Sequence, residues 1–154
     1  MLLLIIYLSK NPMPRVSKIP NILFYNPPNT NLYRMFDLKK AAYIGEMAVV
    51  KRNDLYIENL NIKPDFRRMG FGRKFLDFAV NLSKQMGLNG DLRVMSGLTT
   101  NDLENSPHIF YRKYGFTSYD KEILNKIDEH IKNHTKPAPY DLPLTIMYYV
   151  NNNL

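Results

Sequence analysis

The sequence predicts a single α/β domain with a mixed sheet, and three observations support this prediction. Short apolar runs of strand length are interspersed with amphipathic segments of helical period along the 154 residues. A basic, glycine-containing cluster separates one apolar strand from the helix that follows it. The length suffices for one sizeable core but is too short for two ordinary domains. We therefore expect residues 1–154 to form one domain.

The first half of the chain is predicted to be rich in strands. Residues 1–7 are apolar, too short to span a bilayer and without a secretory leader, so they are interpreted as a first strand. Residues 11–30 contain five prolines, and long helices are not expected there. Short turns then predict an antiparallel meander of three strands, over residues 32–38, 42–50 and 55–62.

The second half is predicted to alternate helices with strands. Apolar residues recur at helical spacing from Phe71 to Met86, and Gly87 or Gly90 is a natural stop. The isoleucines between residues 121 and 134 form one apolar stripe. The further elements are a strand over 91–98, a helix over 106–114, a strand beginning at 116–119, a helix over 121–134 and a strand over 144–150.

Composition restricts the classes of function. The net charge of +7 indicates an anionic partner, such as a phosphorylated cofactor, nucleic acid or an acidic surface. The absence of cysteine excludes disulfides, thiolate ligands and a cysteine nucleophile. His130 and His134 have a metal-compatible spacing, but no carboxylate motif accompanies them, so no metal site is expected. No apolar run is long enough to span a membrane, and we expect a cytoplasmic protein.

The most informative segment is Arg67–Lys74, which lies where a helix is predicted to begin. A helix N-terminus has unpaired N–H donors and a partial positive charge, so it favours bound anions. Gly70 and Gly72 remove the Cβ atoms that would keep a phosphate away from those donors. Four cations within the eight residues would attract such a phosphate. The segment predicts a site for a diphosphate, although glycines mark many tight turns without one.

Two motifs together carry a family resemblance. Residues 67–72 fit the R/Q-x-x-G-x-G/A signature of the GNAT N-acetyltransferase superfamily, and residues 108–116 resemble its second signature, H-x-F-Y-x-x-x-G-F. The resemblance covers residues 32–119 well, whereas the helix over 121–134 is a departure from the family. It implies a GNAT fold, which is a mostly antiparallel mixed sheet of about six or seven strands, flanked by helices and splayed between the fourth and fifth strands.

The resemblance also implies acetyl-CoA as the acetyl donor. In the family, the pantetheine arm of the cofactor pairs with backbone in the splay, and the diphosphate binds the amides of the signature loop. Here these cofactor-binding residues would be Leu60, Asn61, Ile62, Arg67, Arg68, Met69, Gly70, Phe71, Gly72 and Arg73.

Two side chains are candidates for catalysis. Acetyl transfer to an amine requires the neutral amine, and Glu58 is the candidate base, directly or through a water. Some family members place this carboxylate two residues earlier, where this chain has Tyr56, so Glu58 could instead be a solvent-facing carboxylate. Tyr111 matches the family tyrosine that protonates the leaving thiolate, or else it packs in the core. His108 is expected to be structural or adjacent to the cofactor.

The acceptor is not defined beyond an amine. Protein or peptide amines, polyamine-like amines and antibiotic amines all stay open, because fold does not determine substrate. The helix over 121–134 lies either on the acceptor side or at the edge of a homodimer. Two rival classes are a non-catalytic acyl-CoA-binding module and an enzyme acting on a nucleic-acid-associated substrate such as aminoacyl-tRNA. The second is not favoured, since no interleaved aromatic and basic RNA-binding signature is present.

Overall fold

The computed structural model describes residues 18–19, 21–97, 106–138 and 140–152. These residues form seven strands, whose order in the sheet follows their order in the sequence, from β1 to β7. The described residues divide into two compact units, which are considered separately. The first comprises residues up to Val50 together with Glu58–Phe78, and the second comprises Lys51–Ile57 with residues from Ala79 onward.

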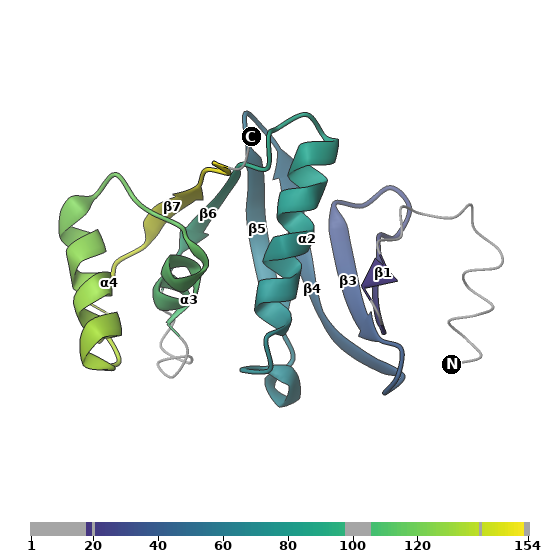
Figure 1. Cartoon of the computed structure of the whole chain (residues 1–154), viewed down its shortest axis with the longest axis horizontal. Coiled ribbons are helices and arrows are strands. Elements are labelled where there is room, and N and C mark those ends of the chain that lie inside the picture. The colour runs from purple at the N-terminus through teal and green to yellow at the C-terminus, as the bar shows by residue number, and fades with distance from the viewer. Residues whose placement is uncertain (1–17, 20, 98–105, 139, 153–154) are drawn as a thin grey trace. The chain divides into compact units, whose positions relative to one another are not determined.

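The first unit is built on antiparallel strands (Figure 1). They are β1 (Lys18–Ile19), β2 (Ile22–Tyr25), β3 (Leu32–Asp37) and β4 (Ala42–Lys51), and the second half of β5 (Leu55–Ile62) follows β4. The helix α2 (Phe71–Gln85) begins after a single 3₁₀ turn, η1 (Pro64–Phe66).

Aromatic rings hold the start of α2 against this part of the sheet. Phe78 stacks on Phe24 of β2 with ring centroids 4.2 Å apart, and Phe75 meets the same ring edge-on at 5.4 Å. Tyr33 of β3 also packs on Phe78, at 5.2 Å. Phe24 and Phe75 are fully buried. Burial of several large rings on one helix face fixes where α2 begins, and therefore where the preceding loop lies.

The second unit contains the parallel part of the sheet. The first half of β5 pairs in parallel with β6 (Leu92–Ser96), and β6 pairs antiparallel with β7 (Thr145–Tyr149). Two helices, α3 (Pro107–Tyr114) and α4 (Lys121–Asn133), complete the unit.

An ion pair links these two helices. Arg112 of α3 contacts Asp128 of α4 through two hydrogen bonds, Nε to Oδ1 at 2.8 Å and Nη2 to Oδ2 at 3.0 Å. Ile127 is the fully buried residue of the apolar stripe on α4.

The structure confirms the predicted α/β class and a sheet of seven strands. The expected first strand over residues 1–7 lies outside the described residues. Strand β2 was not predicted, because its four residues are all buried and give no alternating pattern. Of the described helices, none is both long enough and apolar enough to cross a lipid bilayer.

The strand predicted to begin at residues 116–119 was wrong. Within this segment only Thr117 forms a bridge, to Tyr148 of β7. The hydroxyl of Ser118 accepts a hydrogen bond from the Asp120 amide at 3.2 Å, and Asp120 then caps α4 through the Ile123 amide. The chain therefore turns into a helix before a strand can extend, since a capping residue satisfies the first helical donors.

Candidate functional site

The burial pattern and the pairing of strand β5 both change after Ile57. Leu55 and Ile57 are buried, and the parallel pairs with β6 run from Leu55 to Ile57. The next two residues, Glu58 and Asn59, are both exposed, which breaks the alternation. The strand nevertheless continues to Ile62. The backbone of Leu60–Ile62, where the resemblance places the pantetheine arm, thus lies beyond the parallel pairs.

Glu58 has a defined neighbour in the first unit. The Nδ2 of Asn31, just before β3, donates a hydrogen bond of 3.0 Å to Glu58 Oε2. Glu58 itself is exposed, so its carboxylate is both accessible and oriented. The sequence did not predict this role of Asn31, because nothing in the residue pattern links two positions 27 residues apart.

The loop between β5 and α2 has an unusual backbone. Arg68 has φ of 60° and Gly70 has φ of 81°, both in the left-handed region. A non-glycine residue there is uncommon and strained, and such residues cluster at functional sites. A Cβ added to Gly70 would meet no atom of the described residues within 4 Å. Turns with left-handed residues align successive N–H groups into concavities that bind anions, and this one leads directly into a helix.

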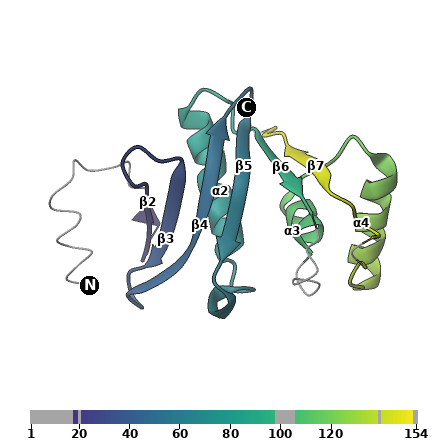
Figure 2. The same ribbon diagram turned by 180° about the vertical axis from the view of Figure 1, so that it is seen from behind.

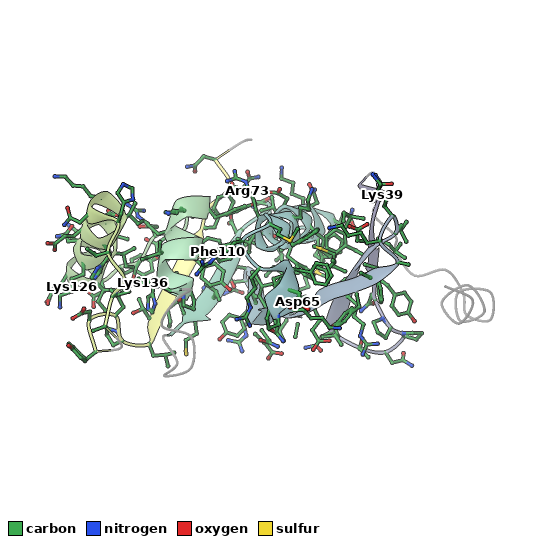
Figure 3. The ribbon with its side chains drawn as sticks, turned by 90° about the horizontal axis from the view of Figure 1, so that it is seen from below. Lys39, Asp65, Arg73, Phe110, Lys126 and Lys136 are labelled. Atoms are coloured by element: carbon green, nitrogen blue, oxygen red, sulfur yellow. The ribbon has the colours of Figure 1, made fainter. Side chains whose placement is uncertain are left out.

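The first turn of α2 supplies further backbone N–H groups that could donate hydrogen bonds to an anion. Lys74 N–H donates to the Gly70 carbonyl at 3.2 Å, so the amides of Phe71, Gly72 and Arg73 precede the first intrahelical bond. Phe71 is buried and meets Phe66 of η1 edge-on at 6.1 Å, which anchors the loop on both sides. By contrast, the Arg73 side chain is exposed and projects outward from the helix (Figure 3), and Arg68 and Met69 are exposed as well.

Arg67 has a structural contact that its motif position did not reveal. Its Nε donates a hydrogen bond of 2.9 Å to the Ile62 carbonyl, and its side chain is half-buried. This bond ties the loop to the end of β5. One backbone acceptor of Ile62 is therefore already engaged.

Tyr111 belongs to the second unit, on α3. Its ring packs between Phe110 at 5.0 Å and Phe116 at 5.1 Å, and the residue is buried. Burial raises the pKa of Tyr111 well above its ordinary value of 10.0, so the hydroxyl stays protonated. Among the described residues, none forms a hydrogen bond with this hydroxyl.

The histidines have structural contacts. His108 is fully buried, its Nε2 lies 3.0 Å from the Pro143 carbonyl, and burial lowers its pKa below 6.5. His130 Nδ1 lies 2.7 Å from Thr135 Oγ1. In the described part of the chain, no group of three or more histidine, aspartate or glutamate side chains is arranged to hold a metal ion.

Comparisons with known proteins address the family directly. A family profile described as "Acetyltransferase (GNAT) domain" matches residues 33–118, which is more than half of the chain. No curated protein matches the sequence significantly.

Solved structures share the fold at low sequence identity. A provisionally assigned streptothricin acetyltransferase from Bacillus anthracis, in complex with acetyl coenzyme A, is 16% identical, with a TM-score of 0.53 over 88% of this chain and 65% of its own. Ard1 from Thermoplasma volcanium is 19% identical, with a TM-score of 0.51 over 79% of this chain and 72% of its own. The PaiA N-acetyltransferase from Thermoplasma acidophilum, in complex with coenzyme A, is 18% identical, with a TM-score of 0.52 over 78% and 60%.

These structural likenesses concern the fold alone, and the chain spans less than two thirds of the first and third of these proteins. The family match, in contrast, rests on the sequence and includes both signature segments. Because it extends over more than half of the chain, this protein belongs to the GNAT acetyltransferase superfamily.

Proposed function

We propose that the protein transfers an acetyl group from acetyl-CoA to a primary amine by direct attack in a ternary complex. Membership of the GNAT family and the acetyl-CoA and CoA bound to two of its structural neighbours support the donor. The turn between β5 and α2 carries the proposal, with left-handed residues at Arg68 and Gly70 and open space above Gly70.

In this proposal, the diphosphate binds the amides from Arg68 to Arg73. A helix N-terminus contributes ~0.3–1 kcal/mol per charge when it is exposed, and more when it is partly buried. The Cβ that Gly70 lacks would fill the space where the phosphate approaches. The pantetheine arm runs along the backbone of Leu60–Ile62, beyond the last parallel pair of β5.

The chemistry needs one base and one acid. A lysine-type amine with a pKa near 10.4 is almost wholly protonated at neutral pH, and Glu58 accepts a proton from it, directly or through a water. The nitrogen then forms a bond to the acetyl carbonyl carbon and the carbon–sulfur bond breaks, while the second proton that the nitrogen must lose to become a neutral amide passes to solvent. Tyr111, whose raised pKa leaves it protonated at neutral pH, gives its proton to the departing sulfur and is then reprotonated from solvent.

Thermal unfolding with and without acetyl-CoA tests the donor site, and the chain offers a matched pair of glycines. Gly70 and Gly87 have φ of 81° and 77°, and in the part of the chain that the structure describes a Cβ at either would meet nothing within 4 Å. Gly70→Ala and Gly87→Ala therefore introduce similar backbone strain, but only the first adds an atom in the proposed diphosphate site. Ligand at about 100 times its Kd should add roughly 2.7 kcal/mol of stability, which raises Tm by several degrees.

We expect the shift in the wild type and in Gly87→Ala, and its loss in Gly70→Ala and in the charged variant Gly70→Glu. A shift of equal size in all variants would contradict the proposed diphosphate site. Absence of a shift in the wild type at millimolar acetyl-CoA would contradict the donor itself, and tRNA binding with its salt dependence should then be measured.

Catalysis is tested separately from binding. A screen of primary amines with a thiol-release assay identifies an acceptor, and the Glu58→Gln and Tyr111→Phe variants are then compared with the wild type. Binding of acetyl-CoA without transfer to any amine, or transfer that neither substitution affects, would favour a non-catalytic acyl-CoA-binding module or a different catalytic group.

A further inference from the structure

A β-bulge interrupts strand β4 next to the end of β5. In the register of β3 with β4, Met35 opposes Gly45 but Phe36 opposes Tyr43, so Ile44 is the extra residue. A bulge bends its strand and redirects the backbone groups beside it. Here the Ile44 carbonyl accepts a hydrogen bond of 2.9 Å from the amide of Lys63, the residue after β5. The bulge thereby holds the end of β5. Strands β4 and β5 lie side by side in Figure 2.

Gly45, next to the bulge, allows an unusually close approach of the two strands. A Cβ on Gly45 would overlap the Asn61 carbonyl oxygen, and it would lie 3.0 Å from Ile62 Cα and 3.2 Å from the Asn61 carbonyl carbon. All three atoms belong to the backbone, which cannot rotate away as a flexible side chain could. A glycine inside a strand often marks such a close approach of another backbone.

We propose that Gly45 is a positioning residue that sets the backbone of Asn61 and Ile62 for pairing with the pantetheine arm. This inference rests on the proposed function, because these are two of the three residues assigned to that pairing. The described parallel pairs of β5 end at Ile57, and beyond them this backbone contacts β4 and accepts the Arg67 hydrogen bond at Ile62. A Cβ at position 45 must push Asn61 and Ile62 out of place. Hydrogen bonds weaken steeply with misalignment, so pairing with the arm should suffer.

The test compares two ligands that share the diphosphate. Acetyl-CoA carries the pantetheine arm, whereas 3′-phosphoadenosine 5′-diphosphate lacks it. For Gly45→Ala we expect the Kd of acetyl-CoA to rise about tenfold or more, as for the loss of one or two hydrogen bonds, while the Kd of the fragment stays within about threefold. Met47→Ala is the control for lost stability, since Met47 is fully buried in the same strand. It should lower Tm and leave both Kd values unchanged.

A second variant removes the hydrogen bond between the bulge and the end of β5 without adding an atom at Gly45. Lys63 has φ of −54° and ψ of 140° and precedes Pro64, so its backbone already suits proline. Lys63→Pro removes the N–H that donates to the Ile44 carbonyl, whereas Lys63→Gln keeps that N–H and removes the charge together with the contact of Nζ over the Tyr43 ring at 4.9 Å. We expect Lys63→Pro to weaken the binding of acetyl-CoA more than the binding of the fragment. Lys63→Gln should change the binding of both ligands alike. This variant keeps the inference testable if Gly45→Ala does not fold.

Each outcome decides a different question. Unchanged acetyl-CoA affinity in Gly45→Ala, or equal losses for both ligands, would overturn the positioning role. So would equal affinities of the two ligands for the wild type, because the arm would then contribute nothing. A wild type that binds neither ligand overturns the proposed function instead.

Discussion

Asn31, just before β3, holds the carboxylate of Glu58 on β5, with 3.0 Å between Asn31 Nδ2 and Glu58 Oε2. One carboxylate oxygen accepts the amide proton, which leaves the other oxygen for an incoming amine or a water. An exposed glutamate on an outer strand face would ordinarily sample several rotamers, and a defined partner reduces that freedom. The contact therefore favours Glu58 as the base over a purely solvent-facing role.

The first prediction concerns Glu58 and uses Glu46 as its control. With an acceptor identified, Glu58→Gln should lower kcat by about a hundredfold or more, the usual contribution of a general base. Glu46 is a half-buried carboxylate of β4 whose Oε2 accepts a hydrogen bond from the Tyr43 hydroxyl at 2.9 Å. Glu46→Gln should leave kcat within about twofold. Equal effects of the two substitutions in steady-state assays would exclude Glu58 as a specific base.

The second prediction concerns the Tyr111 hydroxyl. Tyr111→Phe keeps the ring between Phe110 and Phe116 and removes only the proton donor, so kcat should fall by about a hundredfold while the Kd of acetyl-CoA stays constant. The control is Tyr114→Phe, whose ring packs on Phe116 and Tyr149. Because burial raises the pKa of Tyr111, its ionisation should cause no loss of rate between about pH 8 and 10. An alkaline limb that disappears in Tyr111→Phe would contradict this assignment.

The sequence predicts the elements around the signature loop well because their periodic patterns are strong. The strands at Leu32–Asp37 and Leu55–Ile62 and the helix Phe71–Gln85 end within a few residues of their predicted bounds. Strand β2 has four consecutive buried residues, so it lacks the alternation on which such a prediction depends.

The location of the signature loop could be predicted from the sequence, whereas the contacts that position the other residues of the candidate site could not. Gly70 and the cations define a local pattern, and the left-handed turn at Gly70 agrees with it. The contacts of Asn31 with Glu58 and of Gly45 with Asn61 depend instead on register between separate strands, which a single sequence does not encode locally. A glycine inside the predicted strand 42–50 was the one available signal for a close approach.

The third prediction concerns the ion pair that joins α3 to α4. A double-mutant cycle with Arg112→Ala and Asp128→Ala should give a coupling energy near the upper end of the ~0.2–1 kcal/mol typical of exposed pairs, because the contact is bidentate. Arg112→Ala should destabilise more than Asp128→Ala, since Arg112 also donates to the Phe116 carbonyl at 3.2 Å.

The pair of Lys126 with Glu122 on α4 is the control for this cycle. It joins residues four apart on one helix at 3.0 Å, and the Glu122 side chain is 81% exposed. Its coupling should be smaller, about 0.3–0.5 kcal/mol, and should vanish sooner with added salt. Urea unfolding of all variants at low and high salt measures both couplings. Equal coupling energies would show that the bidentate geometry contributes nothing extra.

The last prediction concerns pH and the buried His108. Its Nδ1 is buried and has no hydrogen-bond partner among the residues that the structure describes, and burial lowers its pKa below 6.5. Folding therefore favours the neutral imidazole. The associated stability is fully present above about pH 6.5, the pKa of the unfolded chain, and is lost progressively as the pH falls below it. The free energy of unfolding should acquire a slope approaching about 1.4 kcal/mol per pH unit from this group.

Two variants isolate this contribution. His108→Gln retains an amide nitrogen that can donate to the Pro143 carbonyl but cannot take up a proton in this range, so its stability should depend less on pH between 5 and about 6.5 than that of the wild type. His134→Gln replaces an exposed histidine and should keep the wild-type slope. Urea unfolding across this range measures the three slopes. A wild-type slope that persists in His108→Gln would mean that other groups, and not this imidazole, destabilise the protein in acid.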